Sequence, residues 1–210
     1  MARLKQGIFG PFTGKLGNMV GYERNGKNFV RSAPVFTKPP TIKQLACQQN
    51  FKIVTRFLAA VETFTRIGYG LEAVLNQSTA YKLALSYHIK NALKGAYPER
   101  DIDFSNVMLS RGKLELPQGL MVERTDQGLR FSWLPGIEHA YCGKRDQIMV
   151  LAYLPELSRS VYLLSGAFRM DGEQVLHLPL YMKNLPMECY VSFVSANRMN
   201  ISDSLYLGSR

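Results

Sequence analysis

The chain has 210 residues, a formal net charge of +10 at pH 7 and 46% apolar residues. This composition is typical of a globular protein with one large domain or two small ones, and it excludes a disordered chain. No apolar run is long enough to span a membrane, and the apolar stretch near the N-terminus is too short for a signal peptide. We therefore expect a cytoplasmic protein with no membrane partner.

The cysteines are informative about the compartment. Cys47, Cys142 and Cys189 are odd in number and far apart in the chain. This pattern indicates reduced, mostly buried thiols in a reducing compartment.

The basic residues are concentrated near the N-terminus. Residues 1–60 hold ten of the 26 Lys and Arg residues but only one of the 16 Asp and Glu residues, Glu23. The formal net charge is therefore near +9 in this segment and near +1 in the remainder. Such a segment attracts polyanions or an acidic protein surface, and a solvated face that maintains solubility is the alternative. The candidate residues for binding a polyanion or a protein partner are Lys5, Lys15, Arg24, Lys27, Arg31, Lys38, Lys52 and Arg56.

The glycine-rich stretch at residues 10–32 predicts a β-hairpin and not a phosphate-binding loop. A P-loop needs a glycine five positions before its Gly-Lys pair and Ser or Thr after the lysine, but Phe9 and Leu16 occupy those positions. Apolar and polar residues alternate on both sides of Asn25-Gly26. This dipeptide favours the type I′ turn of a two-residue hairpin.

Two helices are expected next. Thr41 and Gln44 have the spacing of a capping box, which predicts a helix start after a proline-rich connector. The apolar residues between Cys47 and Phe64 cover half of the helical wheel, so this helix should have two packing neighbours. A second helix is expected from about residue 78 to 93. His88 falls on its apolar side, where a buried core histidine is the preferred interpretation.

From residue 101 onward the pattern changes to short strands at regular spacing. GLMVERTDQGLRFSW indicates two strands joined at Asp126-Gln127-Gly128. The further strand segments are DQIMVLAYLP, VYLLSGAFRM, EQVLHLPLYM, ECYVSFVSAN and SDSLYLG, and no helical period interrupts them. The second half is therefore predicted to be an antiparallel β-sandwich of about seven strands. The predicted fold class is α+β, with a hairpin and two helices in residues 1–100 and the sandwich in residues 101–210.

Two motifs in this second half carry a resemblance. Trp133 ends LRFSW on an early strand, and LPMECYVSFVSAN places a Leu-Pro corner before Tyr190 late in the domain. Together they resemble a fibronectin type III module, a sandwich of the immunoglobulin-like class, over roughly the last ninety residues. The resemblance implies a tyrosine corner, in which the Tyr190 ring is buried and its hydroxyl bonds to upstream backbone. It implies no ligand, because a fold does not determine a function.

A second resemblance covers nearly the whole chain. It rests on GKLGNMVGY, VRSAP, LSYHIKNALKGAYP, IDFSNVMLSRG and SDSLYLG. With these segments the chain resembles an uncharacterised domain-of-unknown-function family that is abundant in gut-dwelling Bacteroidetes-type bacteria. That family has no assigned activity, so the resemblance implies the fold and residence inside the cell.

Residues that usually carry catalysis are sparse. The sequence has three histidines and lacks the HExxH, Cys-x-x-Cys and Gly-x-Ser-x-Gly patterns. Asp101 and Asp103 could form a carboxylate pair, but no histidine lies beside them in the sequence, and a cap for the following strand is the preferred role. Ser110-Arg111 has no base nearby in sequence. We therefore expect no enzyme, no cofactor, no metal and no small-molecule substrate.

Two functions from different classes remain. The first is a structural or assembly protein that binds a protein partner or self-associates into an oligomer, and a component of a phage-derived particle would fit this class. The alternative is nucleic-acid binding by the basic N-terminal segment, because Tyr22, Phe29 and Phe36 interleave with its cations. The preferred interpretation of these aromatic residues, however, is that they form the core face of the hairpin. Whether the basic side chains form one patch or are scattered would distinguish the functions.

Overall fold

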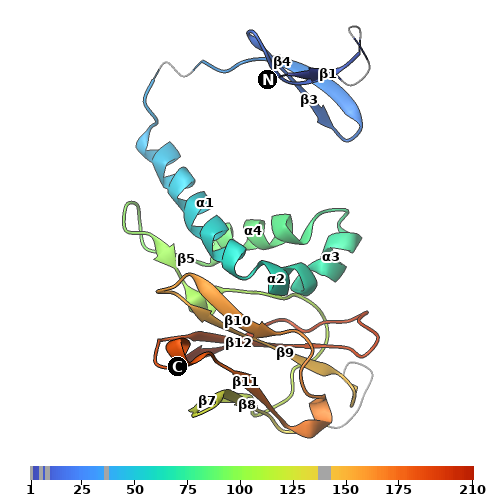
Figure 1. Cartoon of the computed structure of the whole chain (residues 1–210), viewed down its shortest axis with the longest axis vertical. Coiled ribbons are helices and arrows are strands. Elements are labelled where there is room, and N and C mark those ends of the chain that lie inside the picture. Colours follow the sequence, from blue (N-terminus) through green and yellow to red (C-terminus); the bar gives the residue numbers. More distant parts are fainter. Residues whose placement is uncertain (1, 5–6, 8–9, 36–37, 137–142) are drawn as a thin grey trace. The chain divides into compact units, whose positions relative to one another are not determined.

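The computed structural model describes the whole chain except residues 1, 5–6, 8–9, 36–37 and 137–142 (Figure 1). Contacts within the chain divide it into two units, Met1–Ile42 and Lys43–Arg210. The predicted boundary between residues 100 and 101 lies inside the second unit, which contains both the helices and the C-terminal strands.

The first unit is a small antiparallel sheet. Its strands pair in the order β1-β2-β3-β4 and are β1 (Arg3–Leu4), β2 (Phe12–Leu16), β3 (Met19–Arg24) and β4 (Lys27–Ser32). The predicted hairpin is confirmed, because Arg24 pairs with Lys27 across a two-residue turn. Asn25 has φ 52° and Gly26 has φ 73°, and a type I′ turn requires positive φ at both positions.

The second unit begins with helices. They are α1 (Ile42–Ala60), α2 (Glu62–Gly68), α3 (Gly70–Leu75) and α4 (Ala80–Asn91). The first predicted helix is present as α1 and α2, which are separated at Val61, and the second is present as α4. The Thr79 hydroxyl caps α4 by accepting a hydrogen bond from the Lys82 N–H at 3.3 Å. The short helix α3 was not predicted. No helix in the described part of the chain is long and apolar enough to cross a membrane.

Antiparallel strands fill the rest of this unit. A short pair, β5 (Leu93–Lys94) and β6 (Asp101–Ile102), precedes two larger sheets with the strand orders β10-β9-β12-β13 and β11-β8-β7. The seven strands of these sheets are β7 (Met121–Thr125), β8 (Gly128–Ser132), β9 (Gln147–Leu154), β10 (Arg159–Leu163), β11 (Glu173–His177), β12 (Glu188–Val194) and β13 (Leu205–Ser209). Each of the seven predicted strand segments is therefore present.

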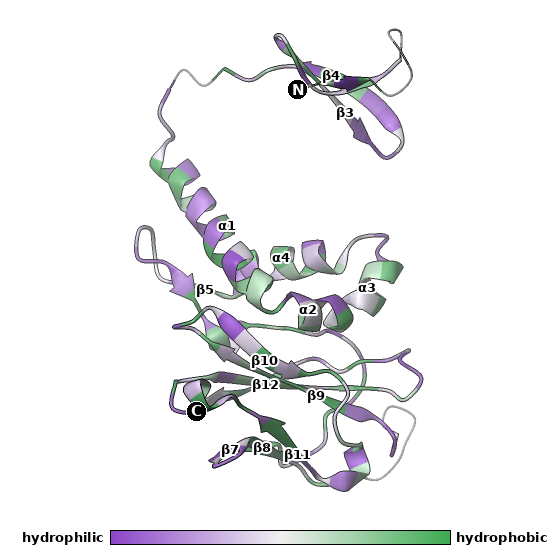
Figure 2. Ribbon diagram, viewed as in Figure 1, coloured by the Kyte–Doolittle hydropathy of each residue, from purple (hydrophilic) through white to green (hydrophobic). Residues whose placement is uncertain are grey.

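Two hydrophobic clusters hold the second unit together. The inter-sheet core lies between the two larger sheets and includes Phe131, Trp133 and Phe193. The helix–sheet core lies on the other face of the four-stranded sheet and includes Phe57 and Phe64 of the helices, and the Phe57 ring packs against that of Tyr153. Figure 1 shows the helices on one side of β9 and β12 and the smaller sheet on the other, and Figure 2 shows hydrophobic residues along β8 and β11. The unit thus has three layers.

Strand β12 contributes side chains to both hydrophobic cores. Successive side chains of a strand point to opposite faces, so Cys189, Val191 and Phe193 join the inter-sheet core. Tyr190 faces the helices, and its buried hydroxyl donates a hydrogen bond to the Phe104 carbonyl at 2.8 Å. In a tyrosine corner the hydroxyl bonds to backbone a few residues upstream of the tyrosine. The acceptor, however, lies 86 residues upstream and not in the turn that precedes the strand.

Helix α1 is buried only in its second half. Val54, Phe57 and Leu58 are buried, whereas Cys47 and Phe51 on the predicted apolar side are exposed. The prediction of mostly buried thiols therefore holds for Cys189 but is wrong for Cys47, because the helix–sheet core does not reach the first turns of α1. Cys142 lies outside the described residues.

His88 is a buried core residue, as its place on the apolar side of α4 predicts. It is 1% exposed, packs against Phe57 and Tyr87, and its Nδ1 donates to the Ala84 carbonyl at 2.6 Å. Burial lowers the pKa of the ring from 6.5 to about 4, since the charged form is desolvated.

This burial predicts a pH-dependent stability. The unfolded chain binds a proton at His88 near pH 6.5 and the folded chain only near pH 4, so stability from neutral His88 is complete above pH 6.5 and is lost as the pH falls toward 4. Between pH 7.5 and 5 we expect this group to lower the free energy of unfolding by about 2 kcal/mol. Urea unfolding of wild type and His88→Leu over this range checks it. The variant should lack that slope, whereas exposed His177→Gln should retain it.

Candidate polyanion-binding site

Strand register gathers part of the basic segment on one face of the N-terminal sheet. Residues directly opposite each other in an antiparallel pair share a face, as do alternate residues along a strand. Lys15 pairs with Val20, Val20 with Arg31, Tyr22 with Phe29 and Arg24 with Lys27. We name the part of this surface formed by paired residues of β2, β3 and β4 the basic face, and its members are Lys15, Val20, Tyr22, Arg24, Lys27, Phe29 and Arg31. Arg3 on β1 lies on the same side of the sheet, because it pairs with Thr13, two residues before Lys15.

Two aromatic rings stand at the centre of the basic face. The centroids of Tyr22 and Phe29 are 5.5 Å apart, and the ring planes differ by 19°. The Arg31 guanidinium lies 5.9 Å from the Tyr22 centroid, a cation–π distance. The two side chains remain 39% and 42% exposed, so these rings do not form a buried core of the hairpin.

The four cations of the basic face are exposed, and none forms an ion pair with a carboxylate among the described residues. Glu23, the one acid of residues 1–60, projects from the opposite side of the sheet, because it lies between Tyr22 and Arg24 on β3. The basic face therefore has one sign of charge around a pair of exposed rings. It can contact phosphates or carboxylates and can stack against planar groups.

Besides Glu23, the other side of this sheet carries large apolar side chains. Leu16, Met19 and Val30 lie there and are 52%, 48% and 58% exposed. At the centre, Gly21 is buried beneath β2, since a Cβ at this position would lie 2.3 Å from the Phe12 carbonyl oxygen. We name this surface the apolar face, defined by Leu16, Met19, Gly21 and Val30.

The remaining candidate cations do not belong to the basic face. Lys38 is exposed in the connector after β4, and Lys5 lies outside the described residues, as does Phe36. Lys52 and Arg56 are exposed on α1 in the second unit. Arg56 lines two clefts there, of about 690 and 280 Å³, and Arg159 also lines the larger one. Four of the eight candidates are thus brought together by one sheet.

The acidic pair has a structural role in local turns. The Asp103 carboxylate accepts hydrogen bonds from the Ser105 hydroxyl at 2.6 Å and the Asn106 amide at 2.8 Å. These bonds, first that of Ser105, lower its pKa. Asp101 accepts the N–H of Ile102 at 2.8 Å. The Asp103 carboxylate also accepts the Ser105 N–H at 3.3 Å and so caps the 3-10 helix Phe104–Asn106. A capping role is therefore present, but the element capped is a short helix and not the strand that was predicted to follow.

The Ser110-Arg111 segment is likewise engaged in structural contacts. The buried Ser110 hydroxyl lies 2.8 Å from the Ser192 hydroxyl and 2.9 Å from the Ser202 carbonyl. Arg111 pairs with Glu72 at 3.3 Å. The described residues contain no group of three or more His, Cys, Asp or Glu side chains placed to hold a metal ion.

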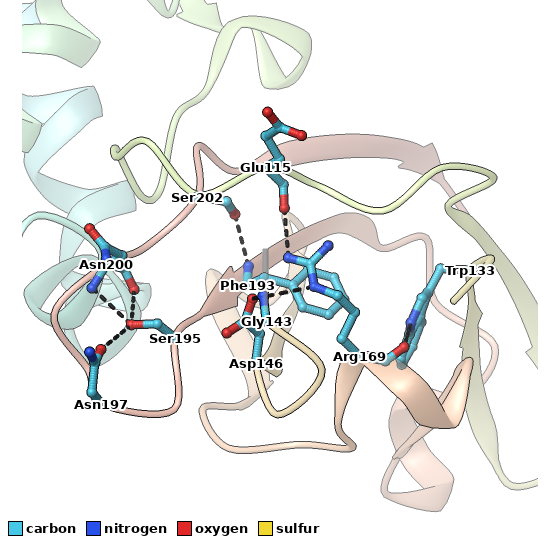
Figure 3. A network of polar contacts seen from close by, with 10 residues as sticks. All are labelled: Glu115, Trp133, Gly143, Asp146, Arg169, Phe193, Ser195, Asn197, Asn200 and Ser202. Carbon is cyan, nitrogen blue, oxygen red and sulfur yellow. Dashed lines mark hydrogen bonds and ion pairs between the residues drawn. The ribbon is translucent and has the colours of Figure 1, made fainter. Parts of the chain in front are cut away.

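The structure contains a buried polar network around Arg169 that was not predicted from the sequence. Arg169 is 1% exposed and pairs with buried Asp146 at 3.4 Å. Its Nη2 donates to the Glu115 carbonyl at 2.6 Å, and its guanidinium lies 4.7 Å from the Phe193 ring centroid (Figure 3). Trp133 Nε1 donates to the Arg169 carbonyl at 2.7 Å. The guanidinium is thus held inside the protein by an ion pair, a hydrogen bond and an aromatic ring, although Arg169 Nε has no hydrogen-bond partner among the described residues. We interpret the network as a structural centre.

Comparisons with known proteins give one match. The model of one protein family matches residues 11–208 of the chain. A search of curated proteins finds no match, and a search of solved structures finds none.

Proposed function

Since the chain belongs to that family of unknown function, DUF6266, from which no activity can be transferred, we propose a role from the geometry of the two units. The proposed role is that of a non-enzymatic assembly protein. The N-terminal sheet docks onto a protein partner or a second copy of the chain, and the second unit is the scaffold that carries it. Incorporation into a phage-like particle in the cytoplasm is one form that such a role can take.

The observation that carries this proposal is the lack of a core in the first unit. Among its described residues only Gly21 is buried, and the apolar face leaves large side chains open to solvent. Sheets this small are marginal in water without another surface against their apolar side. A docked partner would supply that surface.

Strand β4 adds a second point of attachment. It is the outer strand of the sheet, and all six of its residues are exposed. An outer strand presents unpaired backbone N–H and carbonyl groups to which another strand can be added. Docking can therefore combine backbone pairing with burial of the apolar face.

For the scaffold we propose a fibronectin type III-like sandwich with an added helical layer. Support comes from the seven antiparallel strands in two sheets, the shared inter-sheet core and Trp133 at its centre. The grouping differs from an immunoglobulin constant domain in the fourth strand, β10, which pairs with β9. The helices cover the outer face of the larger sheet, so we expect docking through the N-terminal unit instead.

The docking role predicts association that depends on the apolar face. Changing both Leu16 and Val30 to threonine keeps the β propensity of these positions but removes apolar surface. We expect a loss of about 2 kcal/mol of binding free energy, which weakens association roughly thirtyfold. Size-exclusion chromatography with light scattering over a wide concentration range measures this for self-association. For a different protein partner, pull-downs from the native host with the wild type and the double variant compare the strength of association.

A matched control is Val74→Thr, which alters a 79% exposed valine in the second unit and should leave association unchanged. A chain that stays monomeric at every concentration, and whose pull-down partners bind the Leu16/Val30 variant equally well, would contradict the proposal.

The basic face favours a second candidate function, the binding of nucleic acid. Four exposed cations lie on one side of a sheet, and Glu23, the one acid of residues 1–60, lies on the other side. Such a surface attracts a phosphate backbone. This function and docking through the apolar face use opposite sides of the same sheet, so they are compatible.

A further inference from the structure

We infer that the basic face binds single-stranded nucleic acid, whose phosphates contact the four cations while its bases stack on the two exposed rings. This inference rests on the second candidate function and names its ligand. It is carried by the combination of charge, exposed aromatic surface and strand register in one face.

The aromatic pair indicates bases and not only phosphates. The rings of Tyr22 and Phe29 lie nearly parallel, and the two side chains are about two-fifths exposed instead of being buried in a hydrophobic core. Exposed rings on a sheet are stacking platforms for unpaired bases, and such stacking tolerates any base sequence. An acidic protein surface would be attracted by the cations but would leave these rings without a planar partner.

The positions of the cations suit a strand that crosses the sheet. Arg31 and Lys27 are four residues apart on β4, so their Cα atoms are about 13 Å apart along the strand. Phe29 lies midway between them on the same face, with Arg24 opposite Lys27 on β3. Phosphates on either side of a stacked base would therefore meet a positive side chain.

A duplex fits this face less well. Its bases are stacked inside the helix and present only their edges in the grooves, which are read by a helix or a β-ribbon that enters the groove. The two rings stand on the face of the sheet and could reach only bases that are not paired. Single strands are therefore the expected ligand.

The test uses the full chain and a fluorescently labelled oligothymidine, with fluorescence anisotropy at several salt concentrations. Changing both Arg24 and Lys27 to glutamine should weaken binding at least tenfold and reduce the salt slope by about 1.4, since each phosphate contact with a single strand contributes about 0.7. The matched control changes Lys82 and Lys90, exposed cations on α4, to glutamine. This control removes the same charge and should retain both affinity and slope.

The stacking step has its own variants. Tyr22→Leu should weaken binding roughly 5- to 150-fold, the range for loss of one stacked base, and leave the salt slope unchanged. An unchanged slope also shows that the sheet still holds its cations in place. Tyr22→Phe keeps the ring and should bind like wild type.

Competitors separate the possible outcomes. If a duplex of equal length binds as tightly and Tyr22→Leu has no effect, the stacking inference is wrong while nucleic-acid binding stands. If polyglutamate competes as well as oligothymidine, the face recognises acidic surfaces in general and the inference is overturned. If no oligonucleotide binds at low salt, both the inference and the second candidate function are wrong.

Discussion

Arg169→Ala is expected to lower the free energy of unfolding by about 3–5 kcal/mol, because it leaves the carboxylate of Asp146 buried without its cation. The side chain contacts Asp146, the Glu115 carbonyl and the Phe193 ring, and its backbone carbonyl accepts from Trp133. These partners come from segments far apart in the sequence, so the loss should be global. Urea unfolding followed by Trp133 fluorescence, with the single tryptophan as probe, measures it.

The chain contains a matched control for this substitution. Arg130 pairs with Glu173 at 3.5 Å between β8 and β11, but the two side chains are 49% and 60% exposed. Removing an exposed pair costs less than about 1 kcal/mol. If Arg130→Ala and Arg169→Ala destabilise the protein equally, the guanidinium of Arg169 is not buried with Asp146 as described.

Phe57→Ala is expected to lower the free energy of unfolding by about 3–5 kcal/mol, the usual range for replacing a buried phenylalanine with alanine. Phe57 is 1% exposed, and its ring lies 5.0 Å from that of Tyr153 and 5.8 Å from that of His88. It therefore joins α1, α4 and β9. Far-UV circular dichroism reports mainly on the helices and Trp133 fluorescence on the inter-sheet core, and both transitions should shift together.

The control is Phe51→Ala on the same helix, at a position 51% exposed. Its effect should stay within about 0.5 kcal/mol, as for surface substitutions in general. If Phe57→Ala melts the helical signal and leaves the Trp133 transition in place, the helices form a separate domain. That result would support the boundary predicted between residues 100 and 101.

Local signals in the sequence were sufficient for the strands and the first hairpin. Asn25-Gly26 favours a two-residue turn, and the turn determines which residues of β3 and β4 lie opposite each other. The basic face could therefore have been derived by counting outward from the turn, which places Tyr22 opposite Phe29. The grouping of Lys15 with them needed the additional pairing of β2 with β3.

The sequence contains a signal for the three-layer packing, but hydrophobic periodicity alone does not show what covers each face of the sheet. QIMVLAYL in β9 is almost continuously apolar, and such runs indicate a strand buried on both faces. Helices were the one predicted element available to cover the second face. Arg169 had no such signal, because its burial depends on Asp146, Glu115 and Phe193, whose approach is set by the tertiary fold.

The position of the helix–sheet core has a consequence for biosynthesis. The helices end at Asn91, whereas the strand that supplies Tyr190 to their apolar side ends at Val194. At about 5–20 residues per second, a ribosome needs on the order of ten seconds to make the intervening chain. Throughout that interval the hydrophobic side of the helices lacks the part of its cover that β12 supplies, and before β9 is made it also lacks Met149, Leu151 and Tyr153. Chaperones that hold emerging chains would protect this surface until translation of β12 is complete.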